Sequence, residues 1–299
     1  MVRALWTAST GMISQQTNVD TISNNLANMN TTGYKKESAE FKSLLYQTIQ
    51  DQSYNKNGKP KPSGIQLGLG VRNSSITSQY TQGAVVETKN DFDLAIDGNG
   101  FFMVKTQNGD IAYTRNGNFQ MVIGSQGITL ADSEGNPVLD TNLEPIVVDS
   151  SYDSSNIIID KNGELYYKDI EEVTDANADA NADPSADPNA DTSSKPLTKT
   201  VTKPLGIQIA IAQYNNPSGL EKLSDSLLRE TAASGGPILE ATDNTLTRSV
   251  IKQGYLEGSN VQAVDEMVNL IVAQRAYEMN SKIITAADQM LQQANNLRS

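Results

Sequence analysis

Apolar residues recur every seven positions near the N-terminus of the chain. Two such series, offset by three residues, make an a/d stripe that only Gln15 interrupts. The stripe predicts an amphipathic helix from about Val2 to Ala27, about 39 Å long at 1.5 Å per residue. The first series is Leu5, Met12, Val19 and Leu26, and the second is Ala8, Gln15, Ile22 and Met29.

The C-terminus carries the same pattern. Ser259 followed by Gln262 is typical of a capping box, so we expect a second helix to begin there and to continue to about Leu297. Its two series are Leu270, Tyr277, Ile284 and Leu291, and Ala273, Asn280, Ala287 and Ala294. The two long periodic helices therefore lie at the two ends of the chain, where we expect them to form a coiled-coil domain.

Between the helices the pattern is that of strands and turns. Short apolar runs separated by glycines fill residues 91–140, and Asn-Gly pairs at 108–109 and 116–117 predict hairpins. The DGNG segment at 97–100 is also typical of a tight hairpin turn. The fold class is accordingly α+β, with a central β-rich domain between the terminal helices.

Two segments have the composition of linkers. Residues 55–64 mix proline, glycine and lysine, and residues 174–204 carry aspartates at a spacing of four. Alanine, asparagine, aspartate and proline bury too little apolar surface to offset the entropy of ordering. We therefore expect residues 171–204 to form a disordered acidic insertion, and we interpret its aspartates as solvated rather than as a calcium site, because the EF-hand pattern is absent.

Composition excludes several classes of chemistry. The 299 residues contain neither cysteine nor histidine, which removes disulfides, thiolate nucleophiles, the usual zinc sites and the commonest general base. A net charge of −12 disfavours binding to nucleic acid or anionic lipid. Nucleotide-binding motifs are absent as well. We expect no catalytic, cofactor-binding or metal-binding residues, and no enzymatic activity.

Targeting signals of the usual kinds are missing. Polar residues interrupt each apolar run at the N-terminus, so there is no signal-peptide core, and no later segment approaches the roughly 20 apolar residues of a membrane span. We expect a protein without membrane insertion that is either cytosolic or exported without a cleaved signal.

The segment SNNLANMNTTGYKK, residues 23–36, concentrates amides at the end of the first helix. One or two of them are explained by turn formation, since asparagine satisfies loose backbone groups and tolerates the left-handed conformation. The remainder could bond backbones of neighbouring subunits without adding charge. We therefore interpret both amides and stripes as packing surfaces between subunits, formed by Asn24, Asn25, Asn28, Asn30, Leu5, Met12, Val19, Ile22, Leu26, Leu270, Tyr277, Ile284 and Leu291. A helix pair within one chain would give the same stripes.

These segments also resemble a known family. The asparagine-rich helix end is similar to the N-terminal signature of the bacterial flagellar axial proteins, which form rod and hook. Further motifs in the same order resemble the basal-body rod branch of that family, and the likeness covers nearly the whole chain. They are FKSLLYQTIQ at 41–50, PSGIQLGLGVR at 62–72, AIDGNGFFMV at 95–104, YTRNGNF at 113–119 and residues 253–291.

The resemblance implies a structural role. The chain would be a subunit of the distal rod, self-assembling into a helical tube that transmits motor torque to the hook and conducts export substrates. Its partners would be copies of itself, proximal rod and hook proteins, the flagellar type III export apparatus and surrounding rings. It would lie in the basal body, in the cell envelope outside the cytoplasmic membrane. The acidic insertion departs from the family pattern.

The same resemblance implies a domain plan. Residues 1–30 and 259–299 would form the inner coiled-coil domain, residues 31–70 a rod-specific extended hairpin that fills gaps between subunits, and residues 71–258 the outer β-rich domain. The alternatives are a proximal-rod or hook-type subunit, and a secreted β-rich binding or adhesin module with a helical stalk.

Overall fold

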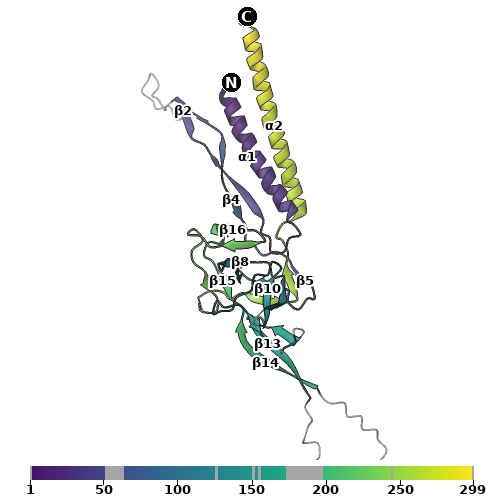
Figure 1. Ribbon diagram of the computed structural model, residues 1–299. Helices are drawn as coiled ribbons and strands as arrows, with labels where there is room; N and C mark the ends of the chain where they lie inside the picture. Colours follow the sequence, from purple (N-terminus) through teal and green to yellow (C-terminus); the bar gives the residue numbers. More distant parts are fainter. Residues whose placement is uncertain are drawn as a thin grey trace, which may run out of the picture. The chain divides into compact units, whose positions relative to one another are not determined.

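The computed structural model describes residues 2–50, 64–124, 127–149, 152–153, 156–172, 198–243 and 245–297. The chain divides into two compact units. Unit 1 comprises residues 1–84 and 258–299, and unit 2 comprises residues 85–257. The predicted combination of two terminal helices and a central β-rich region is confirmed (Figure 1). The predicted linker at 55–63 lies outside the described residues.

Unit 1 is built on two long helices, α1 (Val2–Ala27) and α2 (Ala263–Asn296), which pack side by side in opposite directions (Figure 1). Helix α1 has the predicted bounds. Helix α2 begins after the predicted capping box, because Ser259 accepts a hydrogen bond from the Val261 N–H rather than capping the helix. Within the described residues, neither helix is long and apolar enough to cross a membrane.

A long antiparallel arm completes unit 1. Strand β1 (Glu37–Ser43) pairs with β4 (Val71–Ser78), and β2 (Tyr46–Gln50) pairs with β3 (Ile65–Gly68). Hydrogen bonds between residues 44–45 and 69–70 join the two ladders. The sequence assigned residues 71–84 to the outer domain, but the structure assigns them to unit 1, because β4 pairs with β1 along its whole length.

Unit 2 consists of short antiparallel strands arranged in several sheets. The largest sheet has six strands in the order β16-β17-β8-β7-β15-β18, and β11-β10-β9 and β12-β13-β14 form sheets of three. The remaining pairs are β19-β6 and β20-β5. The strands are β5 (Val85–Glu87), β6 (Leu94–Asp97), β7 (Phe101–Lys105), β8 (Ile111–Thr114), β9 (Phe119–Gly124), β10 (Gly127–Asp132), β11 (Val147–Val148), β12 (Ile157–Ile159), β13 (Glu164–Glu172), β14 (Thr198–Gln208), β15 (Ile211–Gln213), β16 (Glu221–Lys222), β17 (Leu227–Arg229), β18 (Ile238–Leu239), β19 (Val250–Gln253) and β20 (Tyr255–Glu257), with a short 3₁₀ helix, η2 (Pro217–Gly219).

The core of unit 2 contains most of the apolar side chains that the chain buries. Its largest fully buried members include Phe102 and Phe119, whose rings meet edge to face with centroids 5.0 Å apart. A buried ion pair joins Arg115 Nη1 to Glu257 Oε2 at 3.1 Å. Strands β5 and β20 pair with each other, so the chain enters and leaves unit 2 at neighbouring positions.

The structure corrects two of the predicted hairpins. The Asn-Gly pair at 108–109 does connect paired strands, β7 and β8. The Asn-Gly pair at 116–117 lies between β8 and β9, which do not pair with each other. The DGNG segment lies between β6 and β7, which do not pair with each other either. The glycines serve close packing instead: a Cβ atom on Gly117 would overlap the carbonyl oxygen of Leu94, and one on Gly100 would overlap the side chain of Ile211.

The predicted disorder of the acidic insertion is wrong at both of its ends. Residues 171–172 belong to β13 and residues 198–204 to β14, and the two strands pair from Glu172 with Thr198 onward. Backbone hydrogen bonding can extend a ribbon into a polar sequence, because it does not depend on side-chain burial. Residues 173–197 lie outside the described part of the chain.

Candidate assembly surface

Asn25 occupies the end of α1 with its side chain buried, 1 % exposed. Its Nδ2 donates to the carbonyl oxygen of Glu37 at 2.8 Å, and its Oδ1 accepts from the Glu37 N–H at 2.8 Å. The carboxamide thus pairs with one residue of β1 in the manner of a peptide group on a neighbouring strand. The Tyr34 hydroxyl donates to the same Oδ1 at 3.1 Å. One amide therefore fixes the turn from α1 into β1.

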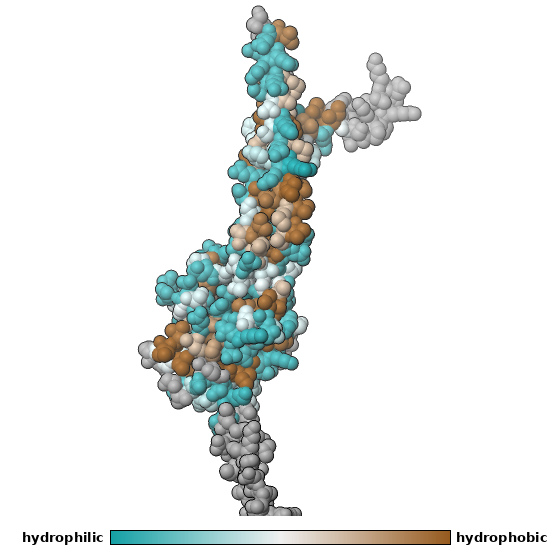
Figure 2. Space-filling model, turned by 90° about the vertical axis from the view of Figure 1, so that its right-hand side faces the viewer, coloured by the Kyte–Doolittle hydropathy of each residue, from teal (hydrophilic) through white to brown (hydrophobic). Residues whose placement is uncertain are grey.

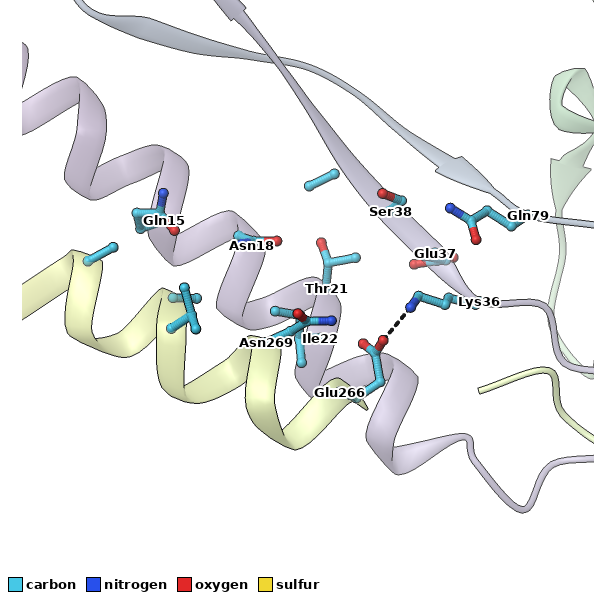
Figure 3. Close-up of a pocket in the computed structure, with 14 residues that line it drawn as sticks. Gln15, Asn18, Thr21, Ile22, Lys36, Glu37, Ser38, Gln79, Glu266 and Asn269 are labelled. Atoms are coloured by element: carbon cyan, nitrogen blue, oxygen red, sulfur yellow. Dashed lines mark ion pairs between the residues drawn. The ribbon is translucent and has the colours of Figure 1, made fainter. Parts of the chain in front are cut away.

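Glu266, in the first turns of α2, is equally buried at 1 % exposed. Its Oε1 pairs with Lys36 Nζ at 2.5 Å (Figure 3), and its Oε2 accepts from Asn25 Nδ2 at 3.2 Å. Burial, together with the negative charges of Glu37 and Glu266, raises the pKa of Tyr34 to about 12, so this phenol stays neutral. The N-terminal segment thereby supplies one cation and one amide to a carboxylate near the start of the C-terminal helix.

Asn260 forms a second amide clamp just before α2. Its Oδ1 accepts from the Lys36 N–H at 2.7 Å, while its Nδ2 donates to the carbonyl oxygens of Gln79 at 2.9 Å and Thr81 at 3.2 Å. Three segments that are distant in the sequence meet here. We call the set Asn25, Lys36, Asn260 and Glu266 the polar junction. The sequence pattern did not predict Lys36, Asn260 and Glu266 as members of this cluster, although all three lie near the helix ends in the sequence.

Replacing Lys36 by methionine is expected to destabilise unit 1 by about 2 kcal/mol, because it leaves the buried Glu266 carboxylate without its cation. The partial exposure of Lys36 keeps the loss below that of a fully buried pair. The measurement is the urea midpoint of the helical circular dichroism signal of the full chain. Lys42→Met, at an exposed position of the strand β1 that follows Lys36, is the matched control. An unchanged midpoint for Lys36→Met would contradict the assigned role of the pair.

The other predicted asparagines lie at the surface of the same turn. Asn28 Nδ2 donates to the backbone carbonyl and to Oδ1 of Asn24, both at 2.9 Å, and Asn24 Nδ2 lies 3.4 Å from Glu37 Oε2. Asn30 is exposed. The bonds of Asn25 and Asn28 are therefore made within the chain, where the sequence reading expected bonds to neighbouring subunits. Asparagine side chains near the unpaired backbone groups at a helix end readily form hydrogen bonds with those groups.

The predicted stripe residues lie mostly between the two helices. Ile22 is buried, and half-buried positions are taken by Leu5, Met12, Val19, Leu26, Leu270, Ile284 and Leu291. Tyr277 differs, with 39 % of its surface exposed. Its neighbour Ala276 is half-buried instead, since a helix of 3.6 residues per turn drifts from a strict seven-residue repeat. We call the contact between these faces of α1 and α2 the seam.

A second apolar face runs along the first turns of α2. Its members are three or four residues apart and interleave with Glu266, Leu270 and Ala273, which face α1, so they lie on the opposite side of the helix. Ile271 is 51 % exposed on this face. We call it the outer face of α2; it consists of Val264, Met267, Val268 and Ile271, with Val272 at its edge, where this side chain also lines a groove beside α1 and β1. Apolar side chains gather over the helices of unit 1 in Figure 2. The three-and-four spacing was present in the sequence, but the seven-residue stripe obscured it.

The arm of unit 1 is also apolar on its surface. Large apolar side chains of β2 and β3, and of the residues next to them, are exposed, although a two-stranded ribbon in water can form with polar side chains at these positions. They are Leu45, Tyr46, Ile49, Ile65, Leu67 and Leu69. In contrast, the only apolar side chains of unit 1 buried below one-tenth exposure among the described residues are Ala8, Ile22, Ala273 and Ala287. Unit 1 thus exposes far more large apolar side chains than it buries.

A groove of about 380 Å³ lies between α1, α2 and β1 (Figure 3). Its walls are mostly small or uncharged polar side chains, with Ile22 and Val272 as the large apolar members, and the ion pair of Lys36 with Glu266 lies at one end. Figure 3 shows Gln15, Asn18, Thr21, Asn269 and Ser38 around it. Within the described residues no group of three potential metal ligands exists. The arrangement holds chain segments together and offers surface for contact.

Comparison with known protein families finds three matches in order along the chain. Residues 5–35 match the family described as flagella basal body rod protein. Residues 95–167 match the flagellar hook protein FlgE/F/G D1 domain, and residues 252–297 match the flagellar basal body rod FlgEFG protein C-terminal family. The first and last matches cover most of α1, all of α2 and, of the polar junction, Asn25, Asn260 and Glu266.

Relatives of similar length extend the likeness over the whole chain. The flagellar basal-body rod protein FlgG of Agrobacterium fabrum is 39 % identical over 97 % of both chains. That of Borreliella burgdorferi is 39 % identical over 100 % of this chain and 99 % of its own. That of Buchnera aphidicola subsp. Acyrthosiphon pisum is 38 % identical over 99 % of this chain and 100 % of its own. The chain belongs to the flagellar basal-body rod protein family, the structural rod subunits of the bacterial flagellum.

Proposed function

We propose that the chain is the subunit of the distal rod and that it assembles with copies of itself into a helical tube. The observation that carries this proposal is the amount of large apolar surface exposed on unit 1, on the outer face of α2 and on the arm. Surfaces of this kind occur in soluble proteins where a partner covers them. Relatives named as rod proteins support the choice of partner.

A head-to-tail contact supports the tubular form. The outer face of α2 and the arm are different surfaces of the same unit. A contact between two different surfaces repeats from copy to copy, and it forms an open helical assembly where the rotation between copies does not close into a ring. In the tube, α1 and α2 would form the inner coiled-coil layer, with the seam residues and those of the asparagine turn at or near subunit contacts. The arm, residues 31–70 of the sequence-based domain plan together with β4, would fill gaps between subunits.

Further partners follow from this placement. A distal rod subunit joins the proximal rod on one side and the hook on the other, passes through the flagellar type III export apparatus before assembly, and lies within surrounding rings of the envelope. The assembled tube would transmit torque from the motor and conduct export substrates through its bore. Unit 2 would lie outside the helical layer.

The test is assembly of the purified full chain beside residues 85–257 alone. Negative-stain microscopy and sedimentation are expected to show tubes or filaments for the full chain, and a folded monomer for the shorter one, since unit 2 has its own core. A full chain that stays a stable helical monomer or dimer at all concentrations would contradict the rod proposal and favour a stalked binding module.

A further inference from the structure

Two contacts made by polar side chains, one by packing and one by a hydrogen bond, connect α1 with α2 across an otherwise largely apolar seam. At one, a Cβ atom on Gly11 would lie only 3.0 Å from Asn280 Nδ2, so the amide fills the space that the glycine leaves. At the other, Asn25 Nδ2 donates to Glu266 Oε2 at 3.2 Å. Asn25 lies fourteen positions after Gly11, and Asn280 lies fourteen positions after Glu266. The two contacts therefore lie two heptads apart on both helices and report the same antiparallel register.

That register extends to the other heptads of the seam. It puts residue 18 opposite residue 273, and Asn18 and Ala273 do line the same groove. It also puts Ala4, which is exposed, at the axial level of Ala287, which is buried at 2 % exposed. Along this stripe an amide thus lies at the level of a small residue twice, two alanines share a third level, and the amide of Asn25 meets the carboxylate of Glu266 at the fourth.

The apolar part of the seam cannot choose a register by itself. Leucine, methionine, valine and isoleucine recur every seven residues, so a slide of one heptad brings apolar side chains opposite apolar side chains again. The polar contacts do not survive such a slide. Glu266 would leave Asn25 and Lys36 while still buried, and Gly11 would face Ala273 or Ala287, which cannot fill its space.

We infer that Gly11–Asn280 and Asn25–Glu266 are register-determining contacts that hold α1 and α2 in one axial alignment. A single buried asparagine has this role in coiled coils, where it specifies register at a cost in stability. In an assembled rod, a fixed register would keep α1 and α2 from sliding past each other under axial and torsional load, and this consequence rests on the proposed function. The register itself does not.

Because the chain has no cysteine, introduced cysteines report the alignment without background. Three double variants of the full chain serve as reporters. Ala4→Cys with Ala287→Cys tests the observed register, whereas Ala4→Cys with Ala294→Cys and Ala8→Cys with Ala276→Cys test slides of one heptad in the two directions. A short bis-maleimide is applied to soluble and to assembled protein, and products of monomer mass are mapped by mass spectrometry.

With the native contacts, only the 4/287 pair is expected to react. Asn280→Leu is expected to keep that pattern while raising the thermal midpoint of the helices, because it removes a polar group from the seam and leaves the Glu266 contact in place. Adding Glu266→Leu to it is expected to raise the yield of one of the shifted pairs about tenfold, while the helical signal is retained.

Three results would overturn the inference. They are absence of the 4/287 product in the native background, equal yields of shifted and unshifted pairs there, and an unchanged single register in the variant that lacks Asn280 and Glu266. A merely structural role for these residues predicts loss of helix in that double variant, without a new cross-link. A chain that cross-links in the observed register but never assembles would contradict the rod proposal and leave this inference standing.

Discussion

Ile271→Asp is expected to abolish assembly of the full chain while leaving both units folded. Ile271 lies on the outer face of α2, half exposed and directed away from α1, so the isolated chain tolerates a carboxylate there. In an assembly the same carboxylate would be buried without a cation, among Val268 and Val272 of its own chain and the apolar surface of the next. The critical concentration for assembly should rise at least about a hundredfold.

The measurement is sedimentation and electron microscopy across a range of protein concentrations, with circular dichroism to confirm an unchanged helical content. Ile123→Asp is the matched control, because it makes the same substitution at a residue of unit 2 that is 85 % exposed. It adds the same charge to a chain whose net charge is already −12. Assembly of Ile271→Asp at the concentration of the native chain would show that the outer face of α2 is not a subunit contact.

Leu26→Asp should also abolish assembly, but by a different route. Leu26 is a half-buried member of the seam and follows Asn25 in the polar junction. A carboxylate at this point enters an apolar contact next to the buried charge of Glu266, so we expect unit 1 to lose about 3 kcal/mol of its free energy of unfolding. The helical signal should fall together with assembly, whereas that of Ile271→Asp should not.

Unit 2 provides the internal reference for this variant. Its core does not include Leu26, so its own unfolding transition should stay at the native midpoint. Leu223→Asp, the same change at an exposed residue of unit 2, should assemble normally. Normal assembly and normal helix stability of Leu26→Asp would contradict the assignment of the heptad stripe to the seam.

The helices illustrate what pattern alone can predict. A seven-residue apolar repeat has few structural solutions, so α1 was predicted with its observed bounds and α2 with an error at its start only. The hairpin at 108–109 was also predicted from a local signal, since Asn-Gly favours the turns that connect paired strands. Where glycine is needed for close packing, as at Gly100 and Gly117, the same letters gave wrong hairpins.

The candidate site was predicted less completely than the helices. The amides at the end of α1 were predicted to lie between subunits, and that role stays a prediction. Within the single chain, Asn25 bonds to Glu37 and Glu266, partners that the sequence pattern did not indicate. Asn260 and Lys36 carry no local pattern that distinguishes them from solvent-exposed residues. The outer face of α2 became visible only once Glu266 and Ala273 were found to face α1.

The sequence by itself determined the elements whose stability depends on neighbours in the chain, which are the amphipathic helices and the Asn-Gly hairpin. It also excluded cysteine and histidine chemistry, because the chain contains neither residue. The tertiary structure decided which of two interchangeable heptads meet, which strands pair across long separations, and which charge is buried. Those outcomes depend on contacts such as Asn25 with Glu266, 241 residues apart, whose energy arises only after folding has removed water from both partners.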